Sequence, residues 1–153
     1  MPSSSDLRPS NFDRYWADTL EDLACVPPAP EVAEIPLRST DFATMYGVRL
    51  TSIGPYRLFA YLSLPKEEAA APFPTVFYFP GYSSVVNPIP QGATHELRRR
   101  YATFSLATRG QRNADRPFAA TYPGLLTVGI DDPSTYVFRG IIADCCRGVE
   151  YLL

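Results

Sequence analysis

The sequence predicts an α/β fold in which two parallel, buried strands carry a site at their carboxyl ends. The runs 75–79 and 103–108 are short and apolar with little polar alternation, which is typical of strands covered on both faces. Each run leads into a glycine-containing segment, Gly81-Tyr82 or Arg109-Gly110-Gln111, and such loops build the sites of open α/β sheets. A helix expected at 92–101 lies between the strands, which favours a right-handed βαβ unit.

An amphipathic helix is expected near the amino terminus, after a flexible arm at residues 1–10. Ser10 is the expected N-cap, with Asp13 three residues later as an approximate capping box. Before Pro27, apolar residues recur at helical spacing, namely Phe12, Trp16, Leu20 and Leu23.

A β-hairpin is expected next. Apolar residues alternate with polar or exposed ones over 48–52 and 58–64, and Gly54-Pro55 supplies the turn between them. The proline-rich stretch 66–74 then crosses the surface to the first buried strand.

The second half of the chain combines a long connection with a helix. Residues 109–130 show little periodicity, and a loop of that length usually covers a site. Asp131-Asp132-Pro133 is a typical helix start. The residues that follow form a broad apolar stripe: Phe138, Ile141, Ile142, Cys145, Val149, Leu152 and Leu153.

The last residues favour a longer parent protein. The apolar stripe is still running at Leu153, without a glycine or asparagine cap. We therefore expect residues 11–153 to be the front part of a single domain. The alternative is a naturally short chain whose last helix docks and buries its own end.

Composition excludes several classes of protein. With 46% hydrophobic and 20% charged residues, a folded core is expected. The net charge is −2 and the one basic block is Arg98-Arg99-Arg100, so a nucleic-acid partner is not expected. Three cysteines without a C-x-x-C pattern and one histidine predict reduced, mostly buried thiols in a cytoplasmic protein, without a metal or cofactor. No apolar run is long enough for a membrane span, so no membrane partner is expected.

The chain resembles the acetyl xylan esterases and cephalosporin C deacetylases, a carbohydrate esterase family with an α/β-hydrolase fold. The resemblance covers nearly the whole chain after residue 10 and depends on the order of several short motifs. These are Phe12-Asp13, Tyr15-Trp16, Thr19-Leu20, Val26-Pro27, Thr51-Ser52, Leu62, Gly81-Tyr82, Arg109-Gly110-Gln111, Gly129-Ile130-Asp131, Tyr136 and Arg139.

The resemblance implies roles for two of these motifs. The backbone N–H of Tyr82 is implied as one donor of an oxyanion hole, in the turn opened by Gly81. Arg109, Gly110 and Gln111 are implied as supporting residues that hold the surrounding loops. Pro80 departs from the family, which usually has histidine there, and proline removes a backbone donor.

The nucleophile implied by the resemblance is absent from the chain. No Gly-x-Ser-x-Gly elbow occurs in the 153 residues, and the family's serine, acid and histidine would all follow the last helix. Ser83 or Ser84 with His95 is rejected as a substitute, because a lone histidine on a polar helix face is usually solvated. Cys145 and Cys146 are rejected because no histidine is predicted within reach.

Two functions are therefore expected as alternatives. The resemblance implies a parent enzyme that removes acetyl groups from small carbohydrate or cephalosporin-type esters by Ser-His-Asp acyl transfer. It also implies a homo-oligomer. The alternative is a non-catalytic, hydrolase-like module that binds a partner through an exposed sheet edge.

Overall fold

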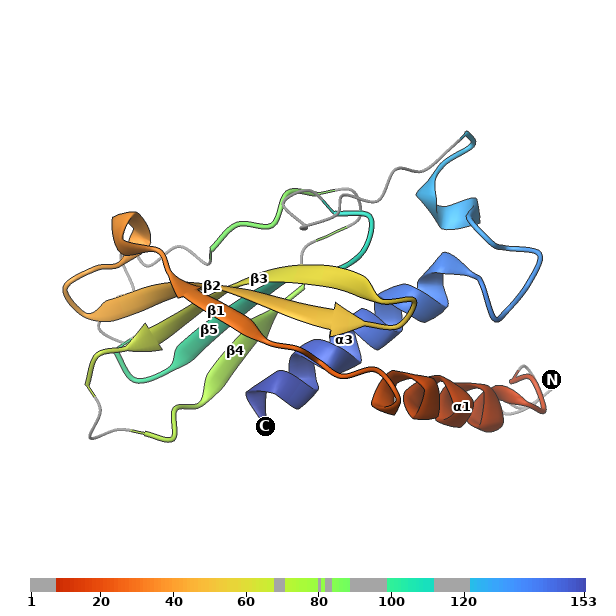
Figure 1. Cartoon of the computed structure of the whole chain (residues 1–153), viewed down its shortest axis with the longest axis horizontal. Coiled ribbons are helices and arrows are strands. Elements are labelled where there is room, and N and C mark those ends of the chain that lie inside the picture. Colours follow the sequence, from red (N-terminus) through yellow and green to blue (C-terminus); the bar gives the residue numbers. More distant parts are fainter. Residues whose placement is uncertain (1–7, 68–70, 80, 82–83, 89–98, 112–121) are drawn as a thin grey trace, which may run out of the picture.

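The computed structural model describes residues 8–67, 71–79, 81, 84–88, 99–111 and 122–153. The described part is a five-stranded mixed sheet with two long helices, α1 and α3 (Figure 1). The strand order is β1-β2-β3-β5-β4. The α/β class is thus confirmed, and α3 crosses one face of the sheet while α1 lies beyond its end (Figure 1).

Strands β2 (Ala43–Ser52) and β3 (Tyr56–Pro65) form the expected hairpin, and both are longer than the sequence pattern indicated. Leu50 stands opposite Leu58 in the antiparallel register. The edge strand β1 (Glu31–Glu34) was not expected, because its four residues are all exposed and carry no alternating pattern.

Strands β4 (Thr75–Tyr78) and β5 (Ala102–Ala107) pair in parallel, as predicted. Every residue of β5 is buried, but the expectation that the first strand is covered on both faces was wrong. Among the described residues β4 is the end strand of the sheet, and Val76 and Tyr78 are 47% and 51% exposed. The helix expected at 92–101 lies mostly outside the described residues, and 99–101 form a turn and bend.

Helix α1 spans Phe12–Ala24 and ends before Pro27, as predicted. Its N-cap is Asn11 without a side-chain hydrogen bond, so the expected Ser10 cap was wrong. Of the expected arm, residues 1–7 lie outside the described part.

Helix α3 spans Val137–Leu152 and begins four residues after Pro133, although Asp131-Asp132-Pro133 was expected to open it. The side chain of Asp132 accepts hydrogen bonds from the N–H and the hydroxyl of Ser134 at 2.8 and 2.7 Å. This Asx turn is a local alternative to a helix N-terminus. Tyr136 is extended (ψ 128°), so the helix begins only after it.

The buried face of α3 differs for the most part from the apolar stripe expected from the sequence, although Leu152 of that stripe packs against the main core. Phe138, Ile142 and Val149 are 39–43% exposed. The residues buried against the rest of the chain are small or polar: Val137, Gly140, Ala143, Asp144, Arg147 and Gly148. The tertiary contacts therefore overrule the hydrophobic periodicity of this helix.

The main core lies between the sheet and α3. It combines alternate residues of the central strands with the end of the helix, where Tyr151 and Leu152 pack: Val48, Leu50, Leu58, Ala60, Leu62, Phe104 and Leu106. On the other face, Phe59 and Tyr61 pack against Val86 and Ala107. Within the described residues, no helix has the length and apolar character needed to cross a membrane.

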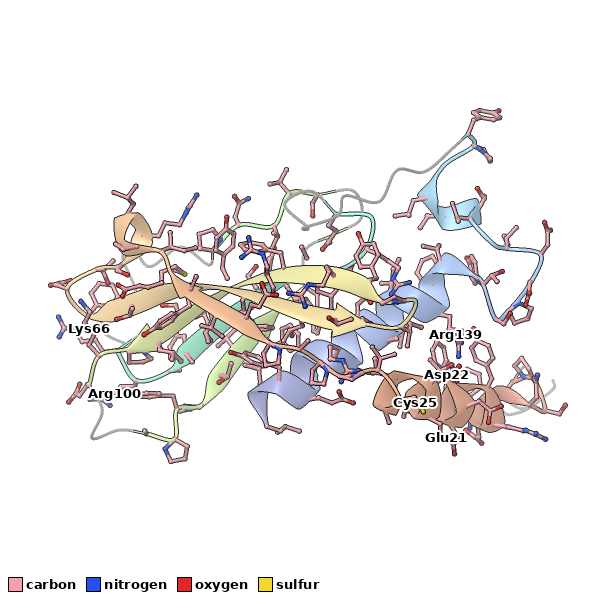
Figure 2. All side chains as sticks on the ribbon, viewed as in Figure 1. Glu21, Asp22, Cys25, Lys66, Arg100 and Arg139 are labelled. Atoms are coloured by element: carbon pink, nitrogen blue, oxygen red, sulfur yellow. The ribbon has the colours of Figure 1, made fainter. Side chains whose placement is uncertain are left out.

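Thr19 and Arg139, which belong to the motifs of the family resemblance, join α1 to α3. Arg139 of α3 donates from Nε to the Thr19 hydroxyl at 3.0 Å and pairs with the carboxylate of Asp22. Figure 2 shows Arg139 and Asp22 facing one another across the two helices. Near the end of α1, Arg147 donates to the carbonyls of Leu23 and Val26.

Candidate functional site

The candidate site lies where the parallel strands β4 and β5 end. Their carboxyl ends meet at one edge of the sheet, because the strands are parallel and paired from Thr75–Ala102 to Tyr78–Ser105. The chain leaves β4 toward Gly81 and leaves β5 into Thr108 and Arg109. This edge is where open α/β sheets place their ligands.

Arg109 ties this edge to α3 and to the hairpin. Its Nε and Nη2 donate to the two oxygens of Asp144 at 2.9 and 2.8 Å, and its backbone N–H donates to the same carboxylate at 2.9 Å. Nη2 also donates to the carbonyl of Ile53 at 3.0 Å, and the guanidinium lies 4.9 Å from the ring centre of Tyr56. One side chain thus joins the end of β5 to two other segments, α3 and the hairpin, which a planar fork of donors does well.

The partner of Arg109 is completely buried. Asp144 has 0% exposure, while the Arg109 side chain is 14% exposed. A carboxylate taken out of water needs this compensation by charge-assisted hydrogen bonds. Sequence reasoning did not identify Asp144, because nothing in its helical neighbourhood indicates that it faces a strand end thirty-five residues away.

Close packing requires glycine at two positions near Arg109. A Cβ at Gly140 would lie 2.3 Å from Nη1 of Arg109, so the guanidinium packs directly on the helix backbone. Gly110 has φ +86°, and a Cβ there would lie 2.3 Å from Leu125.

Gln111 connects the two strand ends. It is buried, at 6% exposure. Its Oε1 accepts a hydrogen bond from the N–H of Thr108 at 2.9 Å, and its Nε2 donates to the carbonyl of Gly81 at 3.2 Å. Ser84 also donates to Gly81, from its hydroxyl at 2.5 Å and its N–H at 3.2 Å.

Several residues singled out in the sequence lie outside the described part. These are Tyr82, the expected oxyanion donor, together with Pro80, Ser83 and His95. Of the expected site residues, the structure brings together Gly81 and Gln111, with Gly110 and Arg109 beside them.

A cavity of about 200 Å³ lies next to Arg109 on the side of α3. Its lining combines the hairpin turn with the start of the helix: Ile53, Gly54, Ser134, Arg139 and Gly140. Both guanidiniums that border it are paired with carboxylates, Arg109 with Asp144 and Arg139 with Asp22.

No group of three or more histidine, cysteine, aspartate or glutamate side chains that could hold a metal ion occurs in the described part of the chain. The three cysteines are free thiols; Cys25 is exposed, contrary to the expectation of mostly buried thiols, and Cys145 and Cys146 are half-buried. Burial, with a smaller contribution from Asp144, raises the pKa of Cys145 to about 12. Burial also raises the pKa of Cys146.

Cys25 and Cys145 should therefore differ in their rates of alkylation. At pH 8 only on the order of one Cys145 side chain in ten thousand is a thiolate, given its raised pKa. We expect iodoacetamide to modify the exposed Cys25 well before Cys145, as measured by peptide mass spectrometry. In urea both should react at similar rates, whereas faster labelling of Cys145 in the folded chain would contradict its raised pKa.

The protein-family model for acetyl xylan esterase (AXE1) matches residues 3–153 of this chain. Two solved structures are similar in fold. Acetyl xylan esterase 1 from Thermoanaerobacterium sp. JW/SL YS485 has 24% identity and a TM-score of 0.77, over 96% of this chain and 49% of its own. Acetyl xylan esterase from Paenibacillus sp. R4 has 23% identity and a TM-score of 0.79, over 99% of this chain and 52% of its own. This chain thus spans about half the length of either structure.

Proposed function

This chain belongs to the acetyl xylan esterase family, and from that membership we propose that it supplies the oxyanion side of an ester-hydrolysing site. The substrate we propose is a small acetylated ester, either an acetylated carbohydrate or a cephalosporin-type ester. The reaction is Ser-His-Asp acyl transfer in the complete enzyme. The serine, acid and histidine would come from sequence other than these 153 residues.

The observation that carries the proposal is the network at the strand ends. Gln111 bonds Gly81, and Arg109 fixes the start of the same loop to the buried Asp144. Ester cleavage passes through a tetrahedral oxyanion, and one fixed N–H directed at it stabilises the transition state by roughly 3–4 kcal/mol. We assign that donor to the backbone N–H of Tyr82, which follows Gly81 in the chain.

Two further properties belong to the same proposal. The free cysteines support a reducing, cytoplasmic location. The family resemblance supports a homo-oligomer.

Expression of the complete reading frame that contains these residues tests the proposal. We expect hydrolysis of p-nitrophenyl acetate and release of acetate from acetylated xylan and cephalosporin C. A folded product of the complete reading frame that cleaves none of these esters would overturn the proposed function.

The isolated 153-residue chain should be inactive. It contains no Gly-x-Ser-x-Gly elbow to present a nucleophile. We expect no p-nitrophenyl acetate hydrolysis above the buffer rate and no acetylated serine by intact mass. A burst of p-nitrophenol with acylation of a serine in this chain would show that its own residues suffice.

A second candidate is a non-catalytic binding module. The open edge of β4 favours it, since Val76 and Tyr78 are exposed beside an edge that no described strand pairs. The codons after Leu153 distinguish the two. A stop codon would favour the module, and a continuation into a Gly-x-Ser-x-Gly segment would favour the esterase.

A further inference from the structure

The carbonyl of Gly81 is held by three donors. The side-chain amide of Gln111 lies 3.2 Å from it, the Ser84 hydroxyl 2.5 Å, and the Ser84 N–H 3.2 Å. A carbonyl oxygen has two lone pairs, so three donors fully occupy its acceptor capacity. Ordinary loop carbonyls at an exposed position would be left to water.

The Gln111 side chain can face Gly81 in one orientation only. Its Oε1 accepts the N–H of Thr108 at 2.9 Å, in a buried contact, so the NH₂ group is the end that reaches Gly81. A flipped amide would set its NH₂ against the Thr108 N–H and its oxygen against the Gly81 carbonyl. Burial and the Thr108 contact thus make Gln111 a fixed donor.

A peptide unit is planar, so holding its oxygen also sets the direction of the N–H on its other side. We propose that Gln111 and Ser84 are positioning residues. Their hydrogen bonds to the Gly81 carbonyl set the direction of the next backbone N–H, that of Tyr82. This inference rests on the proposed function, in which that N–H is the oxyanion donor. Neither side chain needs to touch the substrate.

The variant Gln111→Glu isolates this role. Glutamate keeps the size of glutamine and an oxygen for the Thr108 N–H. When ionised, however, it sets a second acceptor against the Gly81 carbonyl. When protonated, it can again donate, so the defect should be relieved as the pH falls. A role in packing alone would not follow the protonation of this carboxyl group.

In the complete enzyme we expect Gln111→Glu to lower kcat for p-nitrophenyl acetate about 10- to 100-fold near pH 8, with little change in KM. The ratio of variant to wild-type kcat should rise as the pH falls. Ser84→Ala should lower kcat less, because the Ser84 N–H and Gln111 still hold the carbonyl. Ser10→Ala, at an exposed position before α1, is the matched control and should leave kcat unchanged.

A second measurement is made on the 153-residue chain and needs no enzymatic activity. Gly81-Tyr82 is the single Gly-Tyr pair in the sequence, so carbonyl-¹³C glycine and ¹⁵N-tyrosine labelling gives one HNCO signal for this peptide unit. We expect its ¹³C resonance to move upfield in Gln111→Glu and Ser84→Ala, and to stay in place in Ser10→Ala. Circular dichroism checks that each variant is folded.

The outcomes separate the two proposals. An active wild type with unchanged kcat in Gln111→Glu would overturn the positioning role and leave the esterase proposal standing. An inactive wild type would overturn the esterase, and the HNCO signal would still decide whether Gln111 grips the carbonyl. An unmoved signal in folded Gln111→Glu would overturn the inference by itself.

Discussion

Replacing Arg109 with methionine should lower the free energy of unfolding by about 3–5 kcal/mol. The change leaves Asp144, which has no exposed surface, without its cationic partner. It also removes the donor to the Ile53 carbonyl. Domains of this size are stable by about 5–15 kcal/mol, so the loss is a large share of the total.

Urea unfolding followed by circular dichroism measures this effect. The matched control is the double variant Arg109→Met/Asp144→Leu, which removes the unpaired charge and should recover part of the loss. The recovery is incomplete, because the backbone N–H at position 109 also bonds Asp144. An Arg109→Met chain as stable as the wild type would show that the pair contributes little.

The second large effect is expected at Gly148, where α3 lies closest to the sheet. A Cβ at this position would lie 2.6 Å from Cζ of Phe77 and 3.0 Å from Cδ2 of Leu106. We expect Gly148→Leu to destabilise the chain by about 3 kcal/mol, since the helix must move away from β4 and β5. Gly148→Ala should cost less, because the better helix propensity of alanine offsets about 1 kcal/mol of the clash.

The control for Gly148 is its neighbour Val149, which is 43% exposed on the same helix. Val149→Leu adds bulk without meeting the sheet and should change the unfolding midpoint little. If Gly148→Leu and Val149→Leu unfold at the same urea concentration, the close approach of α3 to the sheet is wrong.

Gly140 and Gly148 explain why the packing of α3 differs from its sequence pattern. Glycine at 140 lets the Arg109 guanidinium rest on the helix, and glycine at 148 lets Phe77 and Leu106 approach it. The face that packs is therefore the one with small side chains and with Asp144. Hydrophobic periodicity does not detect such a face, because it counts apolar residues and not the room between elements.

Strands and their connections were predicted well where each element carries its own pattern of residues. The β2–β3 hairpin follows from alternation around Gly54-Pro55, and the parallel β4–β5 pair follows from two short apolar runs separated by a crossover. The Asp131-Asp132-Pro133 segment was misread as a helix start, because an Asx turn uses the same residue types. The exposure of β4 was missed because an apolar run does not reveal that its strand is the last in the sheet.

For the candidate site, the sequence predicted which residues lie at the strand ends, and the tertiary structure decided which residues they contact. The order of Gly81, Arg109 and Gln111 after two apolar runs was enough to place them at the ends of parallel strands. Only the folded chain shows that Asp144 is the buried partner of Arg109. It also shows that Gln111 and Ser84 both donate hydrogen bonds to the Gly81 carbonyl. Strand formation and turns depend on short-range patterns that the sequence displays. Partners separated by about thirty residues are chosen by the packing of α3 and the loops, which no local pattern encodes.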